Sequence, residues 1–180
     1  GQDNHGRDAA NDDEDPSVTT PHPDHGPALY DTGCMGRIIQ FEETEDGRYI
    51  IMLEGLSRFR IEQELPLDPR GFRQVKTDWS AFKSDLDSLA DDPSALLDRA
   101  RLMPSLKQFF NLHGLSADWE AIERTPDDRL ITTLCMICPF EPGEKQALLE
   151  APDIAARADI MQALFDMAVH ENDDAGGIRH

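Results

Sequence analysis

The chain has 180 residues, of which 17 are Lys or Arg and 36 are Asp or Glu, so its net charge at neutral pH is −19. This excess of carboxylates repels phosphate backbones and anionic lipids, which argues against broad binding to nucleic acid or to membrane surfaces. The length suits a single domain with a hydrophobic core and unpacked tails.

The first segment, residues 1–27, is acidic and poor in large apolar side chains. It carries seven acids and one base, and Val18 is its only large apolar residue. Such a segment buries too little apolar surface to offset the entropy of ordering. We expect a disordered acidic linker here and a flexible tail over residues 172–180.

Residues 28–79 show the alternating pattern of β-strands. The extended runs are residues 37–41, 49–53, 58–65 and 71–77. Asp46-Gly47 between the first two is typical of a hairpin turn, and Gly55 is expected to break the second run. The pattern predicts an antiparallel sheet of four strands.

Residues 80–171 change to the three- and four-residue spacing of helices. The predicted helices cover residues 93–111, 130–137, 143–150 and 152–169, with a short turn near Trp119 capped by Ser116 or Asp118. Pro104 should kink or split the first, and His113-Gly114 should end it. Thr125 is expected to cap the helix that follows Pro126. Strands followed by helices predict an α+β fold.

No sequence motif in the chain predicts a cofactor or a metal site. Cys135 and Cys138 have the spacing of a zinc or redox pair, but they lie in an apolar helical run and only Cys34 remains as a third thiol. We interpret them as buried core thiols. An odd cysteine count, no signal-peptide pattern and no apolar run of roughly 18 to 20 residues predict a cytoplasmic protein that does not cross a membrane.

Several strings of the chain resemble one protein family. Those in the β part are residues 29–38, 41–44, 46–49 and 53–61, and those in the helical part are residues 138–140, 144–151 and 155–158. Together they resemble the N-terminal substrate-binding domain of the ATP-dependent Lon protease, most of all its stand-alone bacterial version. The likeness covers roughly residues 28–170.

The resemblance implies a PUA-like antiparallel β pseudo-barrel followed by a helical bundle. In complete Lon proteases this domain helps to recognise clients, whereas separate ATPase and Ser-Lys protease domains unfold and cleave them. No residues here match the motifs of those domains. We therefore expect a non-catalytic protein- or peptide-binding module and not an enzyme, whose partners are unfolded or tagged protein segments, with Lon protease as a further candidate.

Family members usually begin with an apolar strand and a second segment before a linker that resembles residues 1–27. This chain starts inside that linker. If those first strands are absent, the sheet has an open edge, and we expect self-association through it.

The candidate binding residues are large apolar groups and arginines of the β part: Tyr49, Phe59, Phe72, Trp79, Arg37, Arg58 and Arg60. The arginines are expected to orient an acidic segment, while core packing is the alternative role of each aromatic. Two other functions stay open, an RNA-binding PUA-like module and a small hydrolase that uses some of the many carboxylates.

Overall fold

The computed structural model describes residues 26–87 and 97–177, with no side chains described beyond His170. The predicted acidic linker therefore lies almost wholly outside the described residues. None of the helices in the described ranges is long and apolar enough to cross a membrane. The order of elements, strands first and helices afterwards, confirms the predicted α+β class.

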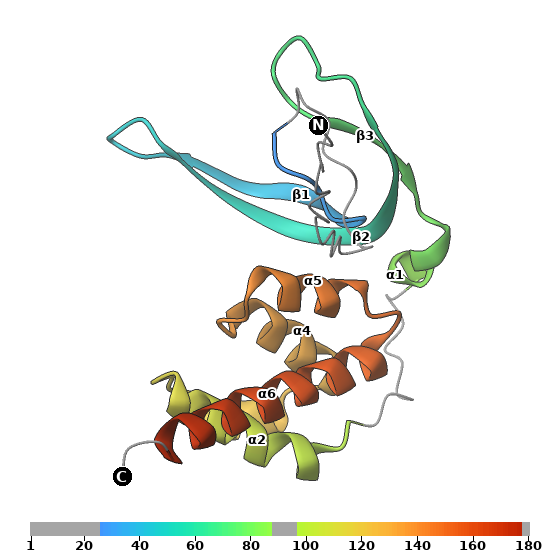
Figure 1. Cartoon of the computed structure of the whole chain (residues 1–180). Coiled ribbons are helices and arrows are strands. Elements are labelled where there is room, and N and C mark those ends of the chain that lie inside the picture. Colours follow the sequence, from blue (N-terminus) through green and yellow to red (C-terminus); the bar gives the residue numbers. More distant parts are fainter. Residues whose placement is uncertain (1–25, 88–96, 178–180) are drawn as a thin grey trace, which may run out of the picture.

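The sheet is antiparallel, with the strand order β1-β2-β3. Its strands are β1 (Thr32–Glu43), β2 (Tyr49–Leu65) and β3 (Gln74–Asp78). The hairpin turn forms where Asp46-Gly47 predicted it, and Gly47 has the positive φ of 77° that such a turn requires. β2 is long and curved: its first part pairs with β1 and its last part with β3 (Figure 1).

Gly55 does not break the second strand, so that prediction is wrong. β2 runs through it, and the two predicted runs on either side of it form one strand. The register of β1 against β2 shifts between Met35 and Gly36 and again between Ile38 and Gln40. An extra residue in one strand bends the ladder without ending it, so a β-bulge rather than a strand end absorbs the irregularity. The described residues therefore contain three strands where four were predicted.

The helices follow as one packed group, preceded by a short 3-10 turn. Their bounds are η1 Ser80–Phe82, α1 Ser84–Asp87, α2 Arg99–Leu112, α3 Trp119–Arg124, α4 Asp127–Ile137, α5 Pro142–Glu150 and α6 Ile154–Gly177. α6 continues through residues 172–177, where a tail was predicted.

The predicted helices form, although the first was expected from residue 93 and α2 begins at Arg99, with Asp98 as its N-cap. Pro104 lies inside α2 and does not split it, while His113 caps the helix and Gly114 follows with φ 64°. The Asp118 side chain accepts a hydrogen bond from the N–H of Ala121 at the start of α3. Pro126 rather than Thr125 stands at the N-cap of α4, so that boundary moves by one residue.

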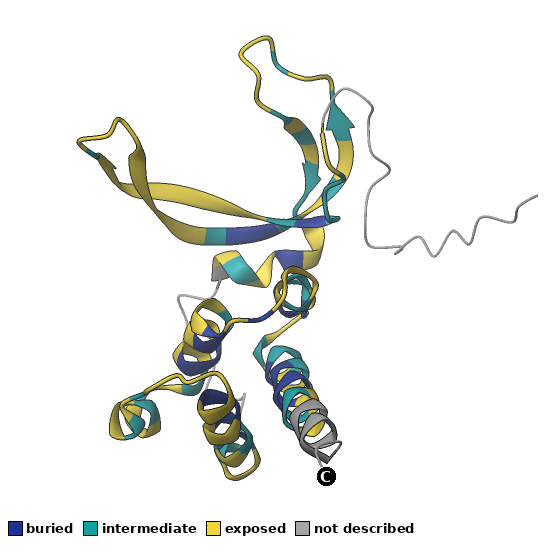
Figure 2. Ribbon diagram, turned by 60° about the vertical axis from the view of Figure 1, so that its left-hand side comes forward, coloured by how far each residue is buried: buried dark blue, intermediate teal, exposed yellow. Residues whose placement is uncertain are grey.

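The hydrophobic core belongs to the helices. Leu106 of α2, Ile131 of α4 and Phe165 of α6 are fully buried. Phe109 packs against Phe165 with ring centroids 4.8 Å apart. The sheet contributes few buried side chains, so the two halves of the molecule meet over a small joint rather than through a shared core (Figure 2).

Arg58 of β2 holds that joint. Its guanidinium donates to both carboxylate oxygens of Asp85 at 2.7 and 2.8 Å, and to the backbone carbonyls of Leu149 and Ala151 in the helical part. A second link runs from the Gln146 amide to the carbonyl of Thr32 at 3.0 Å. These contacts fix the base of the β1–β2 hairpin on α5 and leave its turn end projecting (Figure 1).

Candidate functional site

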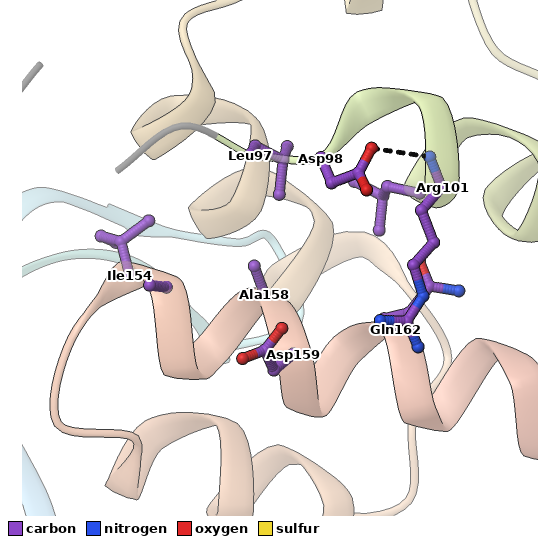
Figure 3. Close-up of a pocket in the computed structure, with 9 residues that line it drawn as sticks. Leu97, Asp98, Arg101, Ile154, Ala158, Asp159 and Gln162 are labelled. Carbon is purple, nitrogen blue, oxygen red and sulfur yellow. Dashed lines mark hydrogen bonds between the residues drawn. The ribbon is translucent and has the colours of Figure 1, made fainter. Parts of the chain in front are cut away.

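Two small pockets lie in the described helical part. A shallow pocket of about 160 Å³ lies between α2 and α6, beside Asp98, Arg101 and Asp159 (Figure 3). A second of about 190 Å³ lies near His113 and Phe140. Both are smaller than the roughly 300 to 1,000 Å³ typical of ligand sites. Within the described ranges no group of three or more His, Cys, Asp or Glu side chains could hold a metal ion.

The most unusual surface of the molecule is the projecting part of the β1–β2 hairpin, residues 35–54, which we call the hairpin arm. Its large apolar side chains are exposed rather than buried: Met35, Ile38, Ile39, Phe41, Tyr49, Ile50, Ile51, Met52 and Leu53. Figure 2 shows this arm as an almost continuous exposed ribbon. A contiguous exposed apolar surface of this kind marks an interaction site more often than a chance feature.

The strand register sorts these side chains into two faces. Residues directly opposite each other in an antiparallel pair lie on the same face, as do residues two apart on one strand. Ile38 is opposite Leu53, and Phe41 is opposite Ile51. The extra residue Ile39 brings Ile38 and Phe41, which are three apart, to the same side.

One face of the arm is therefore apolar from the Ile38–Leu53 pair to Tyr49, where Glu43 lies opposite. We call it the apolar face, and its members are Ile38, Phe41, Tyr49, Ile51 and Leu53, each between 49% and 63% exposed. The rings of Phe41 and Tyr49 stack with centroids 4.9 Å apart, which fixes two aromatic surfaces side by side. The opposite face is mixed, since Gln40 and Glu42 lie there across from Met52 and Ile50.

β1 forms one edge of the sheet. Among the described residues it pairs with β2 on one side and with no strand on the other. Edge strands carry outward backbone N–H and C=O groups that can pair with an added strand. The arm thus combines an apolar face with a backbone edge, which are the two elements of strand addition by an extended peptide.

The predicted binding residues do not gather in one place. Arg37 and Tyr49 lie on the arm, but Phe72 lies in the loop before β3, with the Arg70 guanidinium 4.7 Å from its ring centroid. Arg60 is opposite Asp78 at the far end of the hairpin.

Two of the predicted aromatics pack against the sheet itself. Phe59 lies over Gly33, where an added Cβ would come within 2.7 Å of the ring, and its ring centroid is 5.1 Å from that of Trp79. For these two residues the structure favours the packing role over client contact.

Arg58 needs a correction as a client-binding residue. Its side chain is 8% exposed and is held by Asp85 and by backbone carbonyls of the helical part. A guanidinium so enclosed cannot orient an acidic segment from solvent. Burial raises the pKa of the Asp85 carboxyl, but the hydrogen bonds from Arg58 outweigh that effect and hold the pKa below its ordinary value.

Sequence reasoning missed Ile38, Phe41, Ile51 and Leu53. The candidate residues were chosen among aromatics and arginines, so the aliphatic side chains of the arm were not among them. A signal was present in residues 49–53, where five consecutive large apolar residues leave no polar side for solvent. Such a run is typical of a strand that is covered on both faces, and the described chain covers neither face here.

The two helical cysteines are packing residues. Cys138 is fully buried, and burial raises the pKa of its thiol to about 12. Burial also raises the pKa of Cys135. Because the thiolate is the form that binds metal and attacks disulfides, neither cysteine is poised for that chemistry.

Comparison with known proteins connects these observations to one family. The family model described as the ATP-dependent protease La (LON) substrate-binding domain matches residues 9–165. A solved structure of a Lon N-terminal domain protein from Xanthomonas campestris is similar, with 18% sequence identity, a TM-score of 0.48, and coverage of 78% of this chain and 70% of that chain. No curated protein matches the sequence.

Proposed function

Because the chain belongs to the family of LON substrate-binding domains, we propose that it is a non-catalytic receptor that binds extended, apolar segments of other polypeptides on its hairpin arm. The family is one of binding modules rather than of catalysts, and it binds protein substrates. The arm as the binding surface, the lack of catalytic activity and the unfolded state of the client are the specific content of the proposal.

The exposed apolar face carries the proposal. Five large side chains stand in solvent along one side of a two-stranded ribbon, although burying a single Leu, Ile or Phe contributes about 1.5 to 3 kcal/mol. A client segment with apolar residues at every second position would cover this face while pairing with the free edge of β1. Folded proteins keep such segments in their cores, so the arm would select unfolded or partly unfolded chains.

The proposal assigns no bond-breaking step to this chain. In the described part, the acids with shifted pKa values, Asp46, Asp68, Asp78 and Asp85, are all shifted downward by hydrogen bonds to neighbours. Such carboxylates stay ionised at neutral pH and stabilise the fold. Degradation of a bound client would be the work of a separate protease.

A binding titration with matched variants tests the proposal. A fluorescent, permanently unfolded protein is titrated with the wild-type chain, with the arm variant I38T/F41T/L53T, and with the control variant L86Q/M136Q/I137Q, which removes three equally exposed apolar side chains outside the arm. The arm variant should bind at least about tenfold more weakly, because each half-covered apolar side chain is worth about 1 kcal/mol. The control should bind as the wild type does.

Two outcomes contradict the proposal. Equal binding by the wild type and the arm variant would place the client elsewhere on the molecule. Release of peptide fragments from the client by the purified chain alone would show that it is an enzyme.

A further inference from the structure

Resting on the proposed function, we propose that the arm prefers one class of client, namely extended apolar segments with Lys or Arg at the end that lies over the hairpin turn. This preference is opposite in sign to the acidic segment that the arginines of the sequence suggested. It follows from which charges on the arm are already engaged and which are left at its turn end.

The arm arginines already have carboxylate neighbours. Arg48 lies 2.7 Å from Asp46, and the same pair closes the hairpin turn. Arg37 lies 3.9 Å from Glu54 across the two strands. Arg58, just beyond the arm, is enclosed with Asp85. An acidic client would have to displace one of these partners before it gained a cation.

Three carboxylates near the turn are left without such a neighbour. Glu42, Glu43 and Glu45, which we call the acidic tip, are exposed, and in the described part of the chain no cation lies within ion-pair distance of any of them. From residue 42 to residue 48 the arm carries four acids and one base. The arm's local charge at this end thus favours a cationic ligand.

One member of the acidic tip, Glu43, lies on the apolar face. Glu43 is opposite Tyr49 and so shares a face with the Phe41–Tyr49 stack. A Lys or Arg side chain laid there would place its methylene stem or guanidinium plane on the aromatic rings and its charge beside a carboxylate.

The spacing of the face fixes the pattern of the client. From the Ile38–Leu53 pair to the Glu43–Tyr49 pair β2 advances by four residues, about 13 Å, because Ile39 is an extra residue in β1. A client strand of the same rise covers that length with three apolar residues at alternate positions and reaches the tip with the residues that follow. The preferred segment is therefore three alternating apolar residues with one or two basic residues at the end that lies over the turn.

Three labelled peptides test this inference. They share one alternating apolar segment and carry Lys-Lys, Gln-Gln or Glu-Glu at both ends, so that either strand direction brings one pair over the acidic tip, and each is titrated with the whole chain at low and at high salt. The Lys peptide should bind about tenfold more tightly than the Gln peptide at low salt, and the Glu peptide most weakly, because exposed charge pairs are each worth a few tenths to one kcal/mol. High salt should remove most of the difference.

A charge-matched pair of variants locates the effect. E42Q/E43Q/E45Q should lose the preference for Lys and still bind the Gln peptide. E120Q/E123Q/D159N changes the net charge by the same amount on the helical part, where these side chains are exposed, and should keep the preference. If both variants weaken Lys binding equally, the preference comes from the overall charge and the inference is overturned.

The remaining outcomes separate this inference from the function on which it rests. Equal binding of the Lys and Gln peptides overturns the charge preference but leaves the apolar receptor intact. Failure of all three peptides to bind overturns the receptor itself. Sedimentation of the peptide-free chain as a dimer that I38T/F41T/L53T dissociates would assign the apolar face to a second copy and overturn both.

Discussion

Replacing Arg58 with methionine should break the joint between the sheet and the helices and greatly lower the free energy of unfolding. The substitution keeps an unbranched apolar stem but removes the donors to Asp85 and to the carbonyls of Leu149 and Ala151. Asp85 is then a poorly solvated carboxylate without its cation, since only 17% of its side chain is exposed.

Breaking a buried ion pair from one side costs about 3 to 5 kcal/mol, and the residual exposure of Asp85 places this case near 3. With a urea slope of about 2 kcal/mol per molar, the midpoint of unfolding should fall by about 1.5 M. Circular dichroism recorded during a urea titration measures this midpoint. Arg48→Met is the control, because that arginine is 82% exposed in its pair with Asp46, and its midpoint should not move.

The double variant R58M/D85L distinguishes the loss of the ion pair from the general effect of changing a buried residue. Removing both partners also removes the unpaired carboxylate, so the double variant should be more stable than R58M alone. The account of the joint is refuted if R58M unfolds at the same urea concentration as R48M, or if D85L added to R58M costs as much as D85L alone.

Two further predictions concern Asp85 and the cysteines. The folded state holds the pKa of Asp85 below its ordinary 3.8, so the ionised carboxylate stabilises the folded chain above that pH, and this stabilisation is lost as the pH falls through and below it. Urea midpoints of unfolding measured from pH 6 to pH 2.5 should therefore fall less steeply in D85N than in the wild type. Parallel curves for the two proteins would contradict the assignment. A thiol reagent at pH 8 should label the exposed Cys34 in the native chain and Cys138 only after unfolding, because burial raises the pKa of Cys138 to about 12. Mass spectrometry of the labelled peptides measures which cysteine has reacted. Equal labelling of both cysteines in the native chain would show that Cys138 is accessible.

Local sequence signals predicted most of the secondary structure. Three features depend only on residues close together in the sequence, and each was predicted. They are the Asp46-Gly47 turn, the end of α2 at His113 and the Asp118 cap of α3. The continuity of β2 through Gly55 was not predictable in the same way. A glycine permits either a strand end or a bulge, and the pairing partner on β1 decides between them.

The binding surface was harder to predict because alternation states which side chains share a face but not what covers that face. Tyr49 was identified as a candidate, whereas its neighbours Phe41 and Ile51 were not, although the structure leaves all three exposed. Arg58 shows the reverse error. A surface role is the usual expectation for arginine, and only the tertiary contact with Asp85, 27 residues away, shows that it is structural.

Hydrogen exchange in the presence of an unfolded client tests the central claim most directly, because it reports where on the chain the client binds. The hairpin arm is the predicted site, so backbone amides in residues 36–42 of β1 should exchange more slowly when the client is added, and those of α2 and α6 should not change. Protection confined to the helices, with the arm unaltered, would contradict the account.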